Sequence, residues 1–148
     1  MPVCAAMLRG MERREPAQAI PFRELNPFHR LLGIELLEQS PGHARLRLPA
    51  REELRGGVAG SLHGGVLSAL ADVSCLAAMQ GLFDGRGRPA GTAELNISYL
   101  RPALGAYVIA EARVLKKGRT LAVVDVDLTD PDGRLVAKSR VSYALRPE

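Results

Sequence analysis

The sequence predicts an α+β domain in which an antiparallel sheet of five to six strands wraps around one long helix. Two strand-like runs precede a long apolar helical segment, four strand-like runs follow it, and short turns join the runs. This order differs from the regular strand–helix alternation of a parallel α/β protein. The 148 residues suffice for one domain, and we expect residues 23–148 to form it.

The N-terminal segment, residues 1–22, holds three prolines and one glycine among mixed charges and shows no sustained periodicity. We expect a flexible arm or a short extra helix there. Its apolar residues precede its charges, which is the reverse of a secretory signal, and no apolar run in the chain approaches the roughly 20 residues that span a bilayer. We therefore expect a cytoplasmic protein without a membrane segment.

The composition argues against several functional classes. The chain has 20 Lys and Arg against 16 Asp and Glu, a net charge of +4, with no basic block, no Trp and few aromatic residues to stack on bases. We therefore expect no nucleic-acid partner. The two cysteines, Cys4 and Cys75, provide neither a disulfide framework nor a metal cluster, and we expect both to be free thiols.

A short helix and a hairpin are expected at the start of the domain. Asn26 is a typical N-cap residue, Pro27 suits the first helical position, and Gly33 suits the stop. Strand-like runs at 34–38 and 43–48 flank a Gln-Ser-Pro-Gly turn, and the second run alternates apolar with polar or charged residues. This hairpin should therefore bury one face.

The longest element is a helix over about residues 63–80, which follows a charged, glycine-containing loop and is closed by Gly81. Its apolar side chains occupy almost the whole circumference, while Ser68, Asp72 and Cys75 gather in one narrow sector. A helix that is apolar on every side must be buried, and we expect the sheet to wrap around it.

Four further strand-like runs follow the helix. Several valines mark the third run, and a Pro-Asp-Gly turn precedes the fourth, which is typical of antiparallel hairpins rather than crossovers. The expected runs are 90–100, 106–116, 120–129 and 134–145.

Gly64 and Gly65 stand at the start of the long helix, where backbone N–H groups lack intrahelical partners and the helix dipole is positive. Such an end suits an oxyanion, because glycine lets a carbonyl approach the backbone closely. One well-aimed donor can supply about 3 kcal/mol of transition-state stabilisation. The alternative is that the two glycines only permit tight packing of the helix on the sheet.

Asp72 is the unusual residue of the helix, because it lies too far from the start to be an N-cap and has apolar neighbours. A carboxylate in that place costs free energy unless it is paired, hydrated or useful. It can attack a carbonyl carbon directly or act as a general base toward water. The alternative is an aspartate at a gap in the helix surroundings that faces solvent.

The spacing of these two features has a further consequence. Gly64 and Asp72 are eight residues apart, which is about 12 Å along a helix axis, and they lie on different faces. They cannot serve one carbonyl within one subunit. If both are catalytic, the helix start of one subunit must meet the helix middle of its neighbour, which a two-fold dimer provides twice.

His63 precedes the two glycines and is a tempting base. At the positive end of a helix its cationic form is disfavoured, so packing or backbone hydrogen bonding at the helix start is the better interpretation. No second His or carboxylate lies at metal-ligand spacing from His63, and we expect no metal.

The stretch Leu62-His-Gly-Gly-Val-Leu-Ser-Ala-Leu-Ala-Asp72 resembles the signature of the PaaI-like hotdog thioesterases, relatives of the phenylacetate-pathway and 4-hydroxybenzoyl-CoA enzymes. Residues 91–102 are similar to the strand that follows the central helix in that family, and the resemblance covers about residues 26–145. It implies the hotdog fold and hydrolysis of an acyl-CoA or aroyl-CoA to free acid and CoA.

Carried over by residue, the resemblance implies that Asp72 is the nucleophile or general base and that the N–H of Gly64 polarises the thioester carbonyl. It implies that His63 supports that loop and that Thr92 orients the attacking water. For Thr92 the alternative is a strand threonine chosen for β propensity.

Substrate contacts are expected at two further places. On the helix, Gly65 and Ser68 lie close to the residues already named. Four cations cluster around an expected hairpin, where hotdog thioesterases often meet the CoA phosphates, although a solvated turn accounts for the two lysines equally well. These four are Arg113, Lys116, Lys117 and Arg119.

One position departs from the family pattern. Many relatives carry an Asn six residues before the His, and here that position is Gly57, with no polar side chain among its immediate neighbours. Either backbone groups of the loop replace it, or hydrolysis is slow, or the role has drifted toward binding.

The leading expectation is therefore an acyl-CoA thioesterase that acts as a homodimer, with two dimers forming the homotetramer usual for the family. CoA is part of the substrate, and we expect no cofactor. A non-catalytic acyl-CoA or aromatic-ligand binding module is the first alternative. A hotdog hydratase or dehydratase is the second, although His63 lacks the carboxylate partner that such an enzyme needs.

Overall fold

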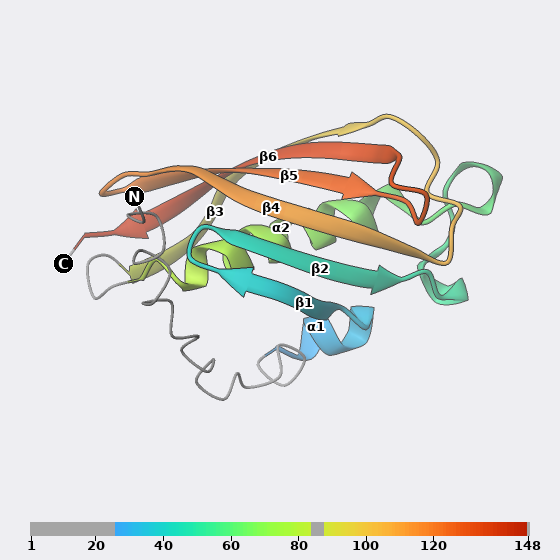
Figure 1. Cartoon of the computed structure of the whole chain (residues 1–148), viewed down its shortest axis with the longest axis horizontal. Helices are drawn as coiled ribbons and strands as arrows, with labels where there is room; N and C mark the ends of the chain where they lie inside the picture. Colours follow the sequence, from blue (N-terminus) through green and yellow to red (C-terminus); the bar gives the residue numbers. More distant parts are fainter. Residues whose placement is uncertain (1–25, 84–87, 148) are drawn as a thin grey trace, which may run out of the picture.

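Six antiparallel strands form one sheet, and one long helix packs against a face of it (Figure 1). The computed structural model describes residues 26–83 and 88–147, so the expected arm at 1–22 and Cys4 lie outside the described residues. The elements are α1 (Pro27–Leu32), β1 (Glu35–Ser40), β2 (His43–Pro49), α2 (Gly64–Gln80), β3 (Arg88–Tyr99), β4 (Tyr107–Lys117), β5 (Leu121–Thr129) and β6 (Leu135–Arg146), with short 3-10 turns at Glu52–Leu54 and Val58–Gly60. The strand order is β1-β2-β4-β5-β6-β3, which confirms the predicted α+β architecture.

The caps of α1 are the ones that the sequence predicts. The Asn26 side chain accepts a hydrogen bond from the Phe28 N–H at 2.9 Å, Pro27 is the first helical residue, and Gly33 ends the helix at φ +72°. A left-handed residue at this point requires glycine, because a Cβ would be strained there. The chain then turns directly into β1.

Alternating burial in the strands builds the inner face of the sheet. In β2 every second residue, Ala44, Leu46 and Leu48, is fully buried, while the charged residues between them face outward. The same alternation in β5 buries Ala122, Val124, Val126 and Leu128. The inner face therefore forms one continuous apolar surface for α2.

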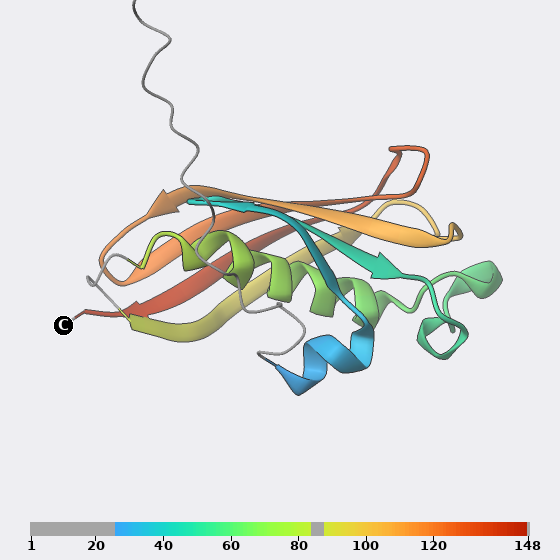
Figure 2. The same ribbon diagram turned by 60° about the horizontal axis from the view of Figure 1, so that its bottom comes forward.

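The helix α2 lies along this surface, with the sheet arching over it (Figure 2). The all-round apolar pattern predicts burial on every side, but only the sheet-facing residues of α2, among them Leu70, Cys75 and Met79, are fully buried in the single chain. The opposite side is only half-buried and includes Val66, Ala69 and Leu76. One stripe of an apolar helix thus remains partly exposed in the single chain.

Among the described residues, β3 forms one edge of the sheet, because its strand partner there is β6 alone. A β-bulge between Thr92 and Glu94 leaves Ala93 without a partner in the register. Thr92 therefore pairs with the buried Tyr143, and it faces the same inner side as Leu95 although the two are three residues apart. The bulge turns Thr92 toward the helix.

No helix among the described residues is long and apolar enough to cross a membrane.

Candidate active site

His63 is the N-cap of α2. Its backbone is extended at φ −63° and ψ 137°, and its Nδ1 accepts a hydrogen bond from the Gly65 N–H at 2.9 Å. An accepting Nδ1 carries no proton, so this hydrogen bond requires the neutral ring with its proton on Nε2. The geometry agrees with the expectation that His63 supports the helix start, and it uses the N–H of Gly65 in doing so.

The N–H of Gly64 is a hydrogen-bond donor at the helix start that the neighbouring residues do not use. The N–H groups of Val66 and Leu67 both donate to the His63 carbonyl, at 3.0 and 3.3 Å. Within residues 26–83 and 88–147 the Gly64 N–H has no acceptor. It carries the partial positive charge of a helix N-terminus and is available to a substrate oxygen.

Tyr99, at the end of β3, packs directly against this first turn. Its hydroxyl donates to the Gly64 carbonyl at 2.9 Å and lies 2.6 Å from the Ser68 Oγ, which itself donates to the same carbonyl at 3.2 Å. A Cβ built on Gly64 would meet the Tyr99 ring at 3.2 Å, so glycine permits the close approach. Tight packing at Gly64 therefore leaves its N–H free, and the packing interpretation does not exclude the donor interpretation.

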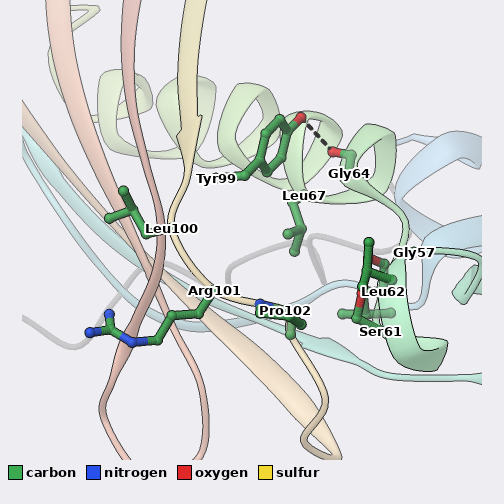
Figure 3. Close-up of a pocket in the computed structure, with 11 residues that line it drawn as sticks. Gly57, Ser61, Leu62, Gly64, Leu67, Tyr99, Leu100, Arg101 and Pro102 are labelled. Atoms are coloured by element: carbon green, nitrogen blue, oxygen red, sulfur yellow. Dashed lines mark hydrogen bonds between the residues drawn. The ribbon is translucent and has the colours of Figure 1, made fainter.

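A pocket of about 350 Å³ opens beside the same turn (Figure 3). It runs between the loop before α2 and the end of β3, with the Gly64–Tyr99 contact at its rim. Most of its lining is apolar, which suits an acyl or aromatic group. The lining residues are Gly57, Val58, Ser61, Leu62, Gly64, Leu67, Tyr99, Leu100, Arg101, Pro102 and Ala103.

Asp72 lies two turns further along α2 and is half-buried. Thr92 of β3 donates its hydroxyl to the Asp72 Oδ1 at 2.5 Å, so two residues to which the resemblance gives separate roles are in contact. Burial, and secondly the Asp72 charge, raise the pKa of the neighbouring Cys75 thiol to about 12. Burial, then Cys75 and Asp72, also raise the pKa of Tyr143. The carboxylate therefore accepts one hydrogen bond from a hydroxyl, and the buried Cys75 and Tyr143 near it have raised pKa values.

The Gly64 donor and the Asp72 carboxylate belong to one uninterrupted helix, eight residues apart. Because an α-helix rises 1.5 Å per residue, their separation along the axis is about 12 Å. Each residue has its own contact on β3, because the Tyr99 hydroxyl donates to the Gly64 carbonyl and the Thr92 hydroxyl donates to the Asp72 carboxylate. One chain thus presents two candidate half-sites on the same pair of elements.

The loop around Gly57 leaves no room for the Asn side chain that many relatives carry at this position. A Cβ at this position would collide with the Ser61 Oγ and would stand 2.8 Å from the Leu62 carbonyl oxygen. The loop is closed in this form because the N–H groups of Gly56 and Gly57 both donate to the Ser61 carbonyl, at 3.2 and 3.0 Å. This loop conformation excludes any side chain at 57, and Ser61 is the polar side chain that it brings to the pocket.

Gly57→Asn should therefore fail to restore a family-type site. We expect no rise in kcat and a loss of about 1–3 kcal/mol in the free energy of unfolding, because the new side chain overpacks the loop. Steady-state thiol release and denaturant unfolding measure the two effects. Gly57→Ala is the matched control, since it adds the Cβ without the amide. A faster Gly57→Asn enzyme of unchanged stability would contradict this account of the loop.

The four predicted phosphate-binding cations lie around the β4–β5 turn. Arg113 is already paired with Glu111, whereas Lys116 and Arg119 are exposed. Residue pairing leads from Lys117 through β5 and β6 to Thr92, so this end of the sheet is the Asp72 end of the helix. The structure also adds two cations at this end that sequence reasoning missed, Arg88 and Arg146, which pair directly with each other.

Sequence reasoning also did not identify Tyr99 and Ser61 as residues of the candidate site. Tyr99 stands two residues after Ile97 in the expected strand, and strand alternation would have placed it on the inner face. Ser61 has no comparable signal, because only the closed loop brings its side chain to the pocket.

Known proteins resemble this chain in sequence and in structure. The family model described as the thioesterase superfamily matches residues 59–137. Human acyl-coenzyme A thioesterase 13 is 39% identical over 116 residues, which cover 76% of this chain and 81% of the relative. The medium/long-chain acyl-CoA thioesterase YigI of Escherichia coli is 30% identical over 132 residues, covering 80% and 85%. The structure of the E. coli PaaI protein from the phenylacetic acid degradation operon superposes with a TM-score of 0.75 at 25% identity, covering 83% and 86%.

Proposed function

We propose that this chain, which belongs to the thioesterase superfamily, hydrolyses an acyl-CoA or aroyl-CoA thioester to a free acid and CoA. The PaaI-like resemblance predicted from residues 62–72 is confirmed, and relatives named acyl-CoA thioesterases support a thioester hydrolase. The observation that carries the finer proposal is the pair of half-sites on α2, a free N–H at Gly64 and a carboxylate at Asp72. Relatives named acyl-CoA thioesterases support CoA as the carrier.

The proposed reaction uses these groups in two steps. As general base, Asp72 takes a proton from a water molecule whose oxygen bonds to the thioester carbon, while the Gly64 N–H stabilises the oxyanion that forms. The C–S bond then breaks, and the CoA thiolate receives the proton from Asp72. As nucleophile, Asp72 would instead bond to the thioester carbon and expel CoA as the thiolate, and water would then hydrolyse the mixed anhydride to the free acid and the Asp72 carboxylate, with the released proton passing to the thiolate. In both versions the Thr92 hydroxyl orients the carboxylate or the water.

The two half-sites require a second copy of the chain. The edge strand β3 carries a partner for each half-site, and it exposes unpaired backbone groups along its free side. We propose that β3 pairs antiparallel with β3 of the second copy, about a two-fold axis at Asn96. Inward-facing residues then oppose each other, Leu95 against Ile97, as strand alternation requires.

This register also unites the half-sites. With Asn96 on the axis, Tyr99 of one copy faces the bulge at Thr92 of the other, so Gly64 of the first approaches Asp72 of the second. The symmetry creates the same site twice. The half-buried stripe of α2 and the exposed Leu100 beside the pocket are apolar surface that a second copy would cover.

The cations at the other end of β3 support a site for the CoA phosphates. Lys116, Arg119, Arg88 and Arg146 gather at the Asp72 end of the sheet, and the two arginines stand opposite each other on paired strands. Like charges in such a pair repel each other, so an anionic ligand between them would relieve the repulsion. The acyl group would occupy the apolar pocket, and the nucleotide would lie toward these cations.

Thiol release from a panel of short, long and aromatic acyl-CoAs tests the activity. We expect release from at least one class. Pure protein that releases no thiol from any of them would contradict the proposal, and calorimetric binding of a non-hydrolysable CoA analogue would then favour the non-catalytic binding module.

Mixing two inactive variants tests the shared site. Each heterodimer of Asp72→Asn with Gly64→Pro holds one site with both groups intact and one site with neither. In a random equal mixture, half of the dimers are mixed, and we expect roughly a quarter of the wild-type activity. The two variants are co-expressed with different tags, and their thiol release is compared with that of each variant alone. Activity no higher than that of the single variants would show that the site does not cross the dimer.

A further inference from the structure

We infer that Tyr99 is a positioning residue that sets the direction of the Gly64 N–H. The inference rests on the proposed function, which makes that N–H the oxyanion donor. Tyr99 has no place in the reaction steps described above. Its hydroxyl reaches the Gly64 carbonyl and the Ser68 hydroxyl from a different element of the fold, 35 residues away in the sequence.

The peptide unit between Gly64 and Gly65 is held at both ends by side chains. Its carbonyl accepts from Tyr99 at 2.9 Å and from Ser68 at 3.2 Å, and its N–H donates to the His63 ring at 2.9 Å. The preceding peptide unit carries the Gly64 N–H, and its carbonyl accepts from Val66 and Leu67. The free donor thus lies between two restrained groups.

These restraints matter because the helix starts with two glycines. Glycine has the widest conformational freedom of all residues, and the first turn of a helix has the fewest internal hydrogen bonds. With two adjacent glycines, the two hydrogen bonds inside the turn need support from contacts outside it to fix the direction of the Gly64 N–H. The ring of Tyr99 supplies one such contact at the Cβ position of Gly64, and its hydroxyl supplies another at the carbonyl.

The geometry fixes the direction of the Tyr99 hydroxyl proton but not that of Ser68. Tyr99 donates to the Gly64 carbonyl, and Ser68 then has a choice between that carbonyl and the Tyr99 oxygen. Removing the Tyr99 hydroxyl leaves the carbonyl with Ser68, whose contact is longer. A donor that moves by a fraction of an ångström away from the oxyanion lowers the rate but leaves the substrate in place, because the apolar lining of the pocket, including the Tyr99 ring, is kept.

Tyr99→Phe is the direct test, because it removes one oxygen and keeps the ring against Gly64. We expect kcat to fall about 10- to 100-fold, with KM for the acyl-CoA changed by less than about threefold. The matched control is Tyr107→Phe on β4, whose ring lies over Arg47 at 4.5 Å and stays there without its hydroxyl. The control should keep wild-type kcat and KM. A Tyr99→Phe enzyme whose kcat stays within twofold, or whose KM alone rises, would overturn the inference.

A backbone measurement separates positioning from general damage. We expect the Gly65 amide, followed by NMR, to exchange its hydrogen faster in Tyr99→Phe, while unfolding stays cooperative. Ser68→Ala is the second variant in case Tyr99→Phe fails to fold, and it should show the same two effects more weakly. Unchanged exchange in a folded variant would refute the positioning role. If wild-type protein releases no thiol, the proposed function fails, but this amide measurement still decides whether Tyr99 holds the turn.

Discussion

Asp72→Asn is expected to lower kcat for thioester hydrolysis by about 10²- to 10⁴-fold, the range that a lost general base or nucleophile accounts for. Asparagine keeps the size of the side chain and an oxygen that the Thr92 hydroxyl can still reach. It can neither take a proton from water nor attack a thioester. KM should change far less than kcat, because the carboxylate acts in the transition state. Steady-state thiol release with the best acyl-CoA measures both constants.

Asp127→Asn is the matched control for this variant. Asp127 lies on β5, where it pairs with Lys138 at 2.6 Å, and it is partly exposed on the outer side of the sheet. Its loss should leave kcat and KM at wild-type values. If the Asp72→Asn enzyme keeps more than about a third of the wild-type kcat, Asp72 is neither the general base nor the nucleophile. The Cys75 thiol offers an independent check, since its pKa of about 12 should fall once the nearby charge is gone, while burial, the larger cause, remains.

Gly64→Pro is expected to lower kcat by about 10²- to 10³-fold beyond the effect of Gly64→Ala. Proline has no N–H, so it deletes the proposed oxyanion donor. The backbone tolerates it, because proline suits the first position of a helix and His63 already has the extended conformation that a residue before proline adopts. The change therefore removes one hydrogen-bond donor and keeps the helix.

Gly64→Ala separates the effect of losing the N–H from the effect of adding a side chain at position 64. Both variants add a Cβ that meets the Tyr99 ring at 3.2 Å, but alanine keeps the N–H. Kinetic constants for the two variants, measured beside their unfolding midpoints, give the contribution of the donor. Equal kcat values for the alanine and proline variants would mean that no oxyanion contacts this N–H.

The two half-sites have different kinds of support in the fold. The Gly64 donor is held by side chains from β3, α2 and the N-cap, whereas Asp72 has one hydroxyl partner, Thr92, on the bulged edge strand. Both supports converge on β3. Pairing of two copies along this strand would therefore act directly on both halves of the site.

Much of the fold is predictable from local sequence. The caps of α1, the limits of α2 and the alternation in β2 and β5 follow from the residue types at short spacing, and the structure confirms them. The same reasoning singles out Asp72, because a carboxylate within an apolar helix is conspicuous without any tertiary information. The eight-residue spacing from Gly64 to Asp72 then predicts a shared site, since helix rise is constant.

Other features depend on contacts between distant segments. Thr92 reaches Asp72 because a bulge in β3 reverses the alternation of its side chains, and a bulge is set by pairing with β6 rather than by residue type. Tyr99 meets Gly64 across the fold, and the collision of any side chain at Gly57 with Ser61 and Leu62 exists only in the closed loop. The sequence by itself determined the helix and the strands, because short-range periodicity and capping encode them, and it singled out Gly64 and Asp72 as the candidate reactive groups. Only the tertiary structure decided which neighbours aim those groups, because that depends on how the edge strand packs against the start and the middle of one helix.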